Sequence, residues 1–225
     1  MNVGVIVAAG KSERMGEGID KAFLNLGTKP VLAWSLLAFE RCPDIEAVIL
    51  VVRKDRLEAA RGLIQIFGCT KVREIVPGGA TRQDSVMAGL AEVPEKASLV
   101  AVHDGARPCV TPELISETLK SAKRYGSGVA AIKVTDTLKE VSRGMVVSRT
   151  VDRSKLWAVQ TPQSFQARLL RAAYALVREQ KALVTDEASA VERLGKPVHL
   201  VPSSPSNLKI TTTDDLVVAE ALLKS

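Results

Sequence analysis

Cysteine, histidine and the aromatic residues are scarce in this chain of 225 residues. Only 4% of the residues are aromatic and the cations are spread along the chain, whereas a nucleic-acid-binding protein concentrates its charge and interleaves aromatic side chains. The three cysteines, Cys42, Cys69 and Cys109, are odd in number and lack a Cys-x-x-Cys spacing, which argues against disulfides and structural zinc and predicts packed thiols. The two histidines, His103 and His199, form no convincing Ser-His-Asp set, and we interpret His103 as a hydrogen-bonded structural residue.

Long apolar runs are missing as well. No apolar stretch reaches the length that spans a membrane, and the chain starts with a strand-like run instead of a basic and then apolar signal peptide. We therefore expect a cytoplasmic protein without membrane contact. The balance of 46% apolar and 25% charged residues predicts one α/β domain over residues 1–225 with a sizeable core.

Strand-like and helix-like segments alternate along the chain. Short apolar segments rich in β-branched residues predict strands, and longer segments with helical apolar spacing predict helices between them. The strands are predicted at 3–7, 46–52, 71–76, 99–103 and 129–134, and the helices at 30–41, 56–67, 82–93, 112–124 and 166–180. Two further helices are predicted to start at Thr185-Asp186-Glu187 and Thr213-Asp214-Asp215. This alternation predicts a Rossmann-like, mainly parallel sheet with helices on both faces.

The segment from Asp136 to Arg153 breaks this alternation. Two short extended runs flank Arg143-Gly144, which predicts a β-hairpin arm inserted between strands of the sheet. Because an isolated hairpin is only marginally stable in water, the arm must pack on something. The sequence leaves two candidates, its own domain and a second subunit.

The first predicted strand ends in a loop of small residues. Ala8-Ala9-Gly10 leaves room for a ligand to approach the backbone, and two cations, Arg14 and Lys21, follow shortly after it. A strand that ends in such a loop presents backbone N–H groups beyond its carboxyl end, where open α/β sheets bind ligands. With the cations, this predicts a site for a polyphosphate. The alternative is an ordinary strand-to-helix turn with two solvated charges.

Two common phosphate-binding motifs are excluded. Gly10-Lys11-Ser12 would supply the end of a Walker A loop, but the first glycine of that motif would fall on Val5. The dinucleotide fingerprint Gly-x-Gly-x-x-Gly fails at Ser12 and at Met15. The sequence supports neither a P-loop ATPase nor an ordinary NAD enzyme.

Eight motifs carry a resemblance to a known family. The pattern Ala8-Ala9-Gly10-x-x-x-Arg14-Met15-Gly16-x4-Lys21 resembles the signature of nucleotidyltransferases that activate sugar phosphates and polyols. The further motifs follow in order: Gly78-Gly79-x-x-Arg82-x-x-Ser85-Val86, His103-Asp104-Gly105-Ala106-Arg107-Pro108, Asp136-Thr137, Thr150-Val151-Asp152-Arg153, Thr161-Pro162-Gln163, Thr185-Asp186-Glu187-Ala188-Ser189 and Asn207-Leu208-Lys209-Ile210-Thr211. Together they resemble the 2-C-methyl-D-erythritol 4-phosphate cytidylyltransferases over nearly the whole chain. Gly105, where alanine is more usual, and Ser12, where glycine is, are small departures.

The resemblance implies a reaction. The phosphate of 2-C-methyl-D-erythritol 4-phosphate would attack the α-phosphorus of CTP and release pyrophosphate, in the non-mevalonate pathway to isoprenoid precursors. Because a phosphate monoester is already largely ionised near pH 7, the site needs positioning and cations more than a strong general base. The net charge of +6 fits such a pocket, the alternative being that it only promotes solubility.

The same resemblance assigns roles to residues. Arg14 and Lys21 match the pair that stabilises charge on the triphosphate, and Arg153 and Lys209 match the pair that positions the attacking phosphate. For Lys209 the alternative is a solvated lysine on an edge strand. The positions around the cytidine triphosphate are matched by Ala8, Ala9, Gly10, Gly79 and Ser85, and those around the methylerythritol phosphate by Asp104, Arg107, Thr137 and Thr185. Mg²⁺ is expected as the CTP chelate, with no protein ligand named.

The resemblance also favours a homodimer in which the arm clasps the second subunit. Thr137 and Arg153 would then be delivered to the partner's active site. CTP, a small polyol phosphate and a second copy of the chain are the expected partners, whereas nucleic acid and membrane are not. Two rival functions remain: a ribitol-5-phosphate cytidylyltransferase of the same fold, and a non-catalytic nucleotide-binding paralogue, which would be expected to have lost Arg14 or Lys21.

Overall fold

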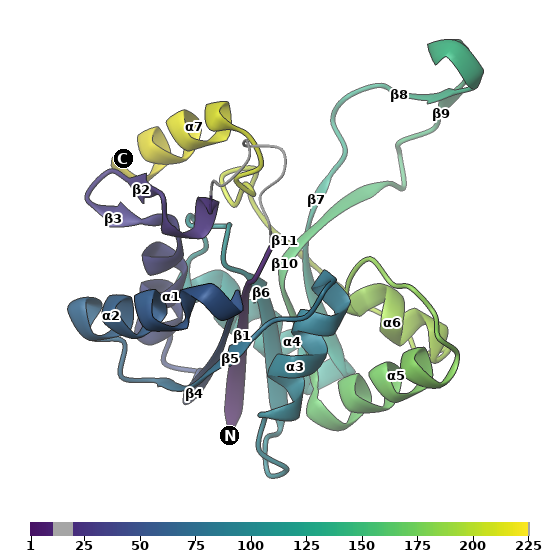
Figure 1. The fold of residues 1–225 in the computed structure, drawn as a ribbon. Helices are drawn as coiled ribbons and strands as arrows, with labels where there is room; N and C mark the ends of the chain where they lie inside the picture. The colour runs from purple at the N-terminus through teal and green to yellow at the C-terminus, as the bar shows by residue number, and fades with distance from the viewer. Residues whose placement is uncertain (11–19, 225) are drawn as a thin grey trace.

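A twisted sheet runs through the centre of the molecule (Figure 1). The computed structural model describes residues 1–10 and 20–224, and within them the sheet has seven strands in the order β11-β7-β10-β6-β1-β4-β5. The strands are β1 (Asn2–Ala8), β4 (Ala47–Val52), β5 (Val72–Pro77), β6 (Leu99–Asp104), β7 (Ser127–Lys133), β10 (Trp157–Gln166) and β11 (Leu200–Pro202). All neighbouring strands are parallel except β10, which is antiparallel to β6 and to β7. The prediction of a mainly parallel sheet is confirmed.

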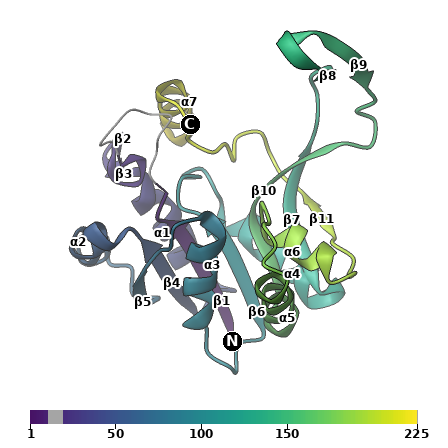
Figure 2. The same cartoon turned by 45° about the vertical axis from the view of Figure 1, so that its right-hand side comes forward.

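Helices cover both faces of this sheet (Figures 1 and 2). One apolar cluster packs α1 (Val31–Arg41), α2 (Leu57–Phe67) and α4 (Pro112–Tyr125) against the sheet. A second cluster packs α3 (Arg82–Ala91), α5 (Ala167–Glu179) and α6 (Glu187–Arg193) against the opposite face. Successive side chains of a strand point to opposite faces, so β1 sends Ile6 and Ala8 into the first cluster and Val3 and Val5 into the second.

Side-chain caps fix where several helices begin. Thr81 and Asp84 form a reciprocal capping box at the start of α3, and Asp186 forms one with Ser189 at the start of α6. Thr111 caps α4 by accepting a hydrogen bond from the backbone of Leu114. The cap predicted for α4 is therefore confirmed. The start of α6 also lies within the predicted segment. Helix α3 starts with Arg82, next to the carboxyl end of β1.

Shorter elements and the last helix surround the carboxyl edge of the sheet. They are η2 (Lys21–Phe23), β2 (Asn25–Leu26), β3 (Lys29–Pro30), η3 (Lys54–Arg56) and α7 (Thr213–Lys224). A small apolar cluster of Leu26, Val31, Ile210 and Ala219 holds α7 against β2 and the start of α1. The backbone N–H of Ile210 also donates to the carbonyl of Ala106 at 2.8 Å. These contacts place the segment around Lys209 above the end of β6.

The sequence analysis did not predict two strands of the seven-stranded sheet, β10 and β11. Strand β10 contains the polar residues Gln160, Thr161, Gln163 and Ser164, all of them buried, and β11 is only three residues long. Their apolar patterns are therefore too weak to predict a strand. Conversely, residues 207–210, considered above as an edge strand, are irregular in the structure.

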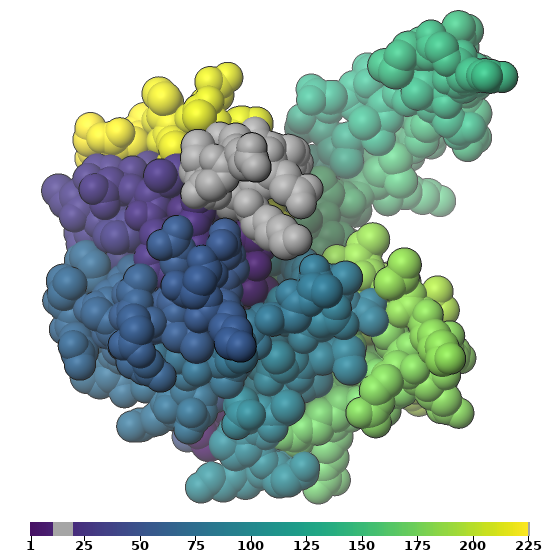
Figure 3. All heavy atoms as spheres, in the orientation of Figure 1, coloured from purple at the N-terminus to yellow at the C-terminus, as the bar shows by residue number. Residues whose placement is uncertain are grey.

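The predicted hairpin arm is present. Strands β8 (Leu138–Val141) and β9 (Val147–Val151) pair antiparallel, with η4 (Arg143–Met145) at the turn, where Gly144 adopts a φ of 75° that favours glycine. The arm stands clear of the rest of the described surface in the space-filling view (Figure 3). Its tip exposes apolar side chains, with Met145 81% and Val146 62% accessible to solvent. Within the described residues, the arm therefore does not pack on its own domain.

None of the helices within the described residues is both long and apolar enough to cross a membrane.

Candidate active site

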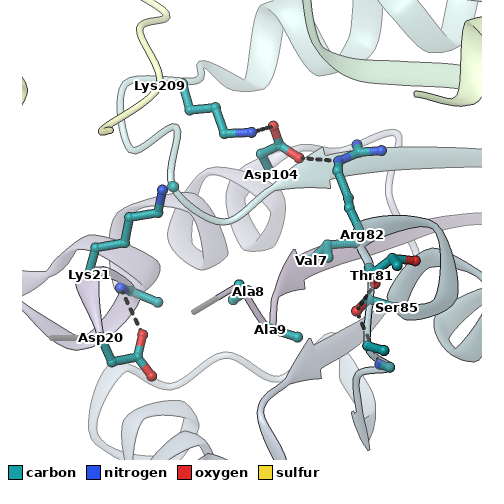
Figure 4. Close-up of a pocket in the computed structure, with 15 residues that line it drawn as sticks. Val7, Ala8, Ala9, Asp20, Lys21, Thr81, Arg82, Ser85, Asp104 and Lys209 are labelled. Carbon is teal, nitrogen blue, oxygen red and sulfur yellow. Dashed lines mark hydrogen bonds and ion pairs between the residues drawn. The ribbon is translucent and has the colours of Figure 1, made fainter. Parts of the chain in front are cut away.

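A pocket of about 210 Å³ lies at the carboxyl ends of β1 and β6 (Figure 4). Lys21 and Asp20 lie at one side of it, Thr81, Arg82 and Ser85 at the other, and the loop with Ala8 and Ala9 lies between them. Eight of the residues expected at the site line this pocket: Ala8, Ala9, Gly10, Lys21, Gly79, Ser85, Asp104 and Lys209. The structure therefore brings together segments from nearly the whole length of the chain, at the edge of the sheet where open α/β folds bind ligands.

Backbone and small side chains form the floor of the pocket. A Cβ atom on Gly78 would lie 2.3 Å from the Cβ of Ala9 and 2.8 Å from the hydroxyl oxygen of Ser85, so only glycine fits between these residues. The hydroxyl of Ser85 accepts a hydrogen bond from the backbone N–H of Gly79 at 3.2 Å and donates to the carbonyl of Thr81 at 2.9 Å. The loop before α3 is thus fixed directly against the loop after β1.

Asp104 is the anionic centre of the pocket. Its Oδ1 accepts from Nε of Arg82 at 3.0 Å, and its Oδ2 pairs with Nζ of Lys209 at 2.8 Å. Only 7% of Asp104 is exposed. Burial alone raises the pKa of this carboxyl, but the charges of Arg82 and Lys209 outweigh burial and hold the pKa well below its ordinary value. Asp104 is therefore ionised at neutral pH and holds two cations at the pocket wall.

Arg107 lies beneath the pocket and does not belong to its lining. Its Nη1 donates to the carbonyl of Asn207 at 2.8 Å, and its Nε lies 3.9 Å from Oδ2 of Asp104. Asn207 in turn donates to Gln160 and to the carbonyl of Thr161, both at 2.9 Å. Arg107 therefore supports the segment that carries Lys209 as well as the carboxylate that Lys209 contacts.

His103 is a structural residue, as the sequence predicted. Its side chain is fully buried, and burial lowers its pKa to about 3, so the ring is neutral. A carbonyl oxygen only accepts, so Nε2 must be the nitrogen that donates to Arg107, at 3.3 Å. Nδ1 is then the acceptor for the hydroxyl of Thr161 at 3.1 Å. That hydroxyl also accepts from the backbone N–H of Asp104 at 3.0 Å.

Arg82 was quoted above only as part of a motif and given no role. Besides Asp104, it contacts Glu187 with both terminal nitrogens, Nη1 at 2.8 Å and Nη2 at 3.0 Å. Burial by itself lowers the pKa of Arg82, but the charges of Glu187 and Asp104 outweigh it and raise the pKa. Glu187 lies 105 positions further along the chain, and no sequence spacing links such distant residues. One indication of this pair is present in the sequence: Arg82 and Glu187 carry opposite charges and each belongs to one of the motifs named above.

Asp20 is a second residue that the sequence analysis missed. It caps η2 by accepting from the backbone of Ala22 at 3.2 Å, and its Oδ2 accepts from Nε of Arg56 at 3.2 Å. The carboxylate is almost completely buried. It therefore fixes the start of the short helix that presents Lys21 to the pocket.

Besides Arg107, three of the expected residues that the structure describes do not line the pocket: Thr137, Arg153 and Thr185. Arg14 lies outside the described residues. Thr185 is exposed just before α6, and the described residues that line the pocket do not include it. Thr137 and Arg153 lie at the base of the arm, where the Arg153 guanidinium donates to the Thr137 hydroxyl at 3.5 Å. The pocket of one chain thus holds those residues matched to the nucleotide that the structure describes, together with Asp104 and Lys209, but not the residues carried by the arm.

The described residues offer no protein cage for a metal ion. Residues 1–10 and 20–224 contain no group of three or more His, Cys, Asp or Glu side chains arranged to hold one. The two carboxylates that line the pocket are already engaged, Asp20 by Arg56, and Asp104 by Arg82 and Lys209. This donor set suits a cation that arrives on a polyphosphate, since Mg²⁺ keeps most of its waters and takes few protein ligands.

None of the three cysteines lines the pocket. Cys42 and Cys69 are buried, Cys109 is half-buried and all three are free thiols, so the prediction of packed thiols is confirmed. Burial raises the pKa of Cys109 to about 11, and a protonated thiol is a poor nucleophile.

Comparisons with known proteins agree with this geometry. A family model described as 2-C-methyl-D-erythritol 4-phosphate cytidylyltransferase matches residues 2–225. The chain is 46% identical over 220 residues to the protein of that name from Dehalococcoides mccartyi strain 195, covering 98% of this chain and 95% of the relative. It is 41% identical over 222 residues to the protein of the same name from Alkaliphilus oremlandii, covering 98% and 94%.

Solved structures give the same result. The crystal structure of 2-C-methyl-D-erythritol 4-phosphate cytidylyltransferase from Thermus thermophilus superposes with a TM-score of 0.84 at 37% identity, covering all of both chains. That of a 4-diphosphocytidyl-2C-methyl-D-erythritol synthase from Anaerococcus prevotii superposes with a TM-score of 0.86 at 30% identity, covering 100% of this chain and 98% of the other.

Proposed function

The chain belongs to the 2-C-methyl-D-erythritol 4-phosphate cytidylyltransferase family, and from this premise we propose that the pocket at the ends of β1 and β6 is its active site. The enzyme is a CTP-dependent nucleotidyltransferase of isoprenoid precursor synthesis. It transfers a cytidylyl group from CTP to 2-C-methyl-D-erythritol 4-phosphate and gives 4-diphosphocytidyl-2-C-methyl-D-erythritol and pyrophosphate. The observation that carries the assignment of the site is the juxtaposition of Lys21 and Lys209 around one floor of small residues.

In this proposal the nucleotide lies on the floor of the pocket. Ala8, Ala9 and Gly10 leave room for the triphosphate next to the backbone, and Lys21 neutralises the charge that accumulates on it. The loop from Gly79 to Ser85, which the Ser85 hydroxyl holds in place through Gly79 and Thr81, is proposed to border the pyrimidine. Arg14, which lies outside the described residues, is proposed to act with Lys21.

The acceptor phosphate is proposed to lie beside Lys209. An ionised phosphate monoester needs no base, so the site only has to hold it in line with the α-phosphorus and offset the repulsion between two anions. The ammonium group of Lys209 is a compact charge at the end of a flexible side chain. Oδ2 of Asp104 pairs with its Nζ at 2.8 Å. Arg107 is proposed to support this lysine from beneath the pocket. Asp104, which lines the pocket, is proposed to orient the lysine and to receive the hydroxyl groups of the polyol, with Thr185 at the rim.

A divalent cation, Mg²⁺ in this proposal, would enter as the chelate of CTP. When bound there it neutralises part of the triphosphate charge. The lining residues fit this arrangement because Asp20 and Asp104 already pair with protein cations, so neither is a free ligand for a resident metal.

The second half of the site is proposed to come from another copy of the chain. Thr137 and Arg153, at the base of the arm, do not line the pocket of their own chain. The arm extends away from the sheet (Figures 1 and 2), and its tip exposes Met145 and Val146. A twofold homodimer would cover such a surface and supply two equivalent composite sites. We further propose that residues 1–225 form one nucleotidyltransferase domain that works in the cytoplasm.

One assay tests the function. Pyrophosphate release is measured with CTP, UTP, ATP and GTP, each combined with 2-C-methyl-D-erythritol 4-phosphate or ribitol 5-phosphate. We expect turnover with CTP and the methylerythritol phosphate, and poor turnover with the purine nucleotides. Preferred turnover of ribitol 5-phosphate would instead establish the rival transferase, and no release with any pair would establish a non-catalytic paralogue.

A further inference from the structure

Glu187 is a buried carboxylate that the proposed mechanism does not use. It is completely inaccessible to solvent, and it does not belong to the pocket lining. Its two oxygens accept from the two terminal nitrogens of Arg82, and Oε1 also accepts from the hydroxyl of Tyr174 at 3.0 Å. A chain of contacts therefore runs from Tyr174 in α5 through Glu187 and Arg82 to Asp104 at the pocket wall.

Stability alone is a poor explanation for this pair. Removing two charges from water is costly, and apolar residues of similar volume often stabilise a fold equally well. A buried, bidentate ion pair does, however, fix the plane of a guanidinium. What Glu187 provides is therefore the orientation of Arg82.

The orientation of Arg82 determines which cation contacts each carboxylate oxygen of Asp104. With both terminal nitrogens held by Glu187, Arg82 presents only Nε to Asp104 and uses only Oδ1. Oδ2 is left for Lys209 at 2.8 Å, as Figure 4 shows. If Glu187 lost its charge, the guanidinium would be drawn to its remaining anionic partner, and arginine prefers to grip a carboxylate with two N–H groups. Arg82 would then compete with Lys209 for Oδ2.

We propose that Glu187 is a positioning residue for cytidylyl transfer: by holding both terminal nitrogens of Arg82, it reserves one oxygen of Asp104 for Lys209. This inference rests on the proposed function, because Lys209 is assigned there to the acceptor phosphate. It follows that loss of Glu187 impairs use of the polyol phosphate more than use of CTP.

The test compares Glu187→Gln with Glu192→Gln. Both glutamates lie on α6, but Glu192 is exposed, so the second variant controls for a change of charge on that helix. We expect Glu187→Gln to lower kcat/KM for 2-C-methyl-D-erythritol 4-phosphate by roughly ten- to a hundredfold, the range expected when a charged hydrogen bond is lost. The KM for CTP should stay within about twofold, because the nucleotide contacts are untouched. Glu192→Gln should behave like the wild type.

A second background separates positioning from general damage to the fold. If Glu187 acts through Asp104, Glu187→Gln should cause little further loss in an Asp104→Asn enzyme, because these two effects are not additive. An equal loss in both backgrounds, or an equal rise in the KM values of both substrates, would overturn the proposal. So would a folded Glu187→Gln enzyme with wild-type kinetics.

An unfolded variant and an inactive wild type have different consequences for the proposal. If circular dichroism shows that Glu187→Gln does not fold, Arg82→Lys replaces it: lysine keeps the charge but cannot serve Glu187 and Asp104 with a planar fork, so the same selective loss is expected, and wild-type kinetics would refute the proposal. If the wild type itself releases no pyrophosphate from CTP and the polyol phosphate, the proposed function fails and this inference fails with it. An active wild type with an unaffected variant refutes only the inference.

Discussion

The hydroxyl of Thr161 accepts a hydrogen bond from the backbone N–H of Asp104 at 3.0 Å. This bond joins the antiparallel strand β10 to β6 at the residue where β6 delivers its carboxylate to the pocket. Thr161 also donates to the neutral ring of His103, so one buried hydroxyl satisfies two neighbours. The position of Asp104 is therefore set by β10 as well as by its own strand.

Thr161→Val should weaken both the fold and the site. Valine matches the shape of threonine but leaves the Asp104 N–H without its acceptor, which costs roughly 1–3 kcal/mol. We expect that loss in urea unfolding, together with a lower kcat/KM. Thr118→Val is a matched control, because Thr118 is equally buried but bonds to Ser164 and Ile115, away from the pocket. Equal loss of activity in both variants would contradict the role given to Thr161.

His103 should make the fold sensitive to mild acid. Burial lowers its pKa from 6.5 in the unfolded chain to about 3, so between these values the unfolded state binds more protons. The stability that this histidine confers is therefore complete above pH 6.5 and is lost as the pH falls, with a slope of at most about 1.4 kcal/mol per pH unit. The pKa of Asp104 is also lowered, but its contribution is lost only in stronger acid.

The measurement is the free energy of unfolding in urea at pH 7.5 and pH 5.5. The wild type should be less stable at the lower pH, and His103→Asn, although less stable overall, should show a smaller difference between the two. An unchanged difference in the variant would mean that another group causes the acid sensitivity.

Lys21→Ala should mainly reduce the catalytic step. The ammonium group matters most while negative charge rearranges around the α-phosphorus, and removal of one such electrostatic contact lowers kcat by about two to three orders of magnitude. Steady-state pyrophosphate release measures this. Lys54→Ala, which removes an exposed lysine of η3 outside the pocket, should leave kcat unchanged. Near-normal turnover of Lys21→Ala would make Lys21 an ordinary surface lysine.

Mixing two inactive variants should restore activity if the arm acts on the partner subunit. Lys21→Ala damages the pocket and Arg153→Ala damages the arm, so a mixed dimer has one site with both defects and one with neither. With random exchange of equal amounts and independent sites, activity should return to about a quarter of the wild type. Each variant incubated alone is the control. Demonstrated exchange without recovery would show that Arg153 serves its own chain.

The sequence predicted the parts of the fold that depend on local pattern. Apolar β-branched runs gave β1, β4 and β6, and the Thr111-Pro112 cap gave the start of α4, because these signals lie within a few neighbouring residues. The loop at Ala8-Ala9-Gly10 was found for the same reason. It lies in the pocket as a consecutive motif.

What the sequence did not predict depends on partners far along the chain. Ser164 looks unsuited to a buried strand, yet it bonds to Thr118 at 2.8 Å inside the core. Gln163 likewise accepts from the backbone of Ala188 at 3.0 Å. Such polar residues are buried only because another element satisfies them, and this also explains why the pairing of Arg82 with Glu187 became visible only in the folded chain.

Lys133 of β7 and Trp157 of β10 face each other in the sheet, so the arm leaves the sheet and returns to it at neighbouring strands. A short turn between these two residues would close the ladder without shifting any other strand pair. The segment that carries Thr137 and Arg153 is therefore an insertion that can be exchanged as a unit, whereas the nucleotide pocket is built at the ends of β1 and β6, from η2 and from the start of α3. Exchange of that insertion would change the acceptor contacts that we propose for Thr137 and Arg153, and would leave Lys209, Asp104 and the nucleotide pocket unaltered.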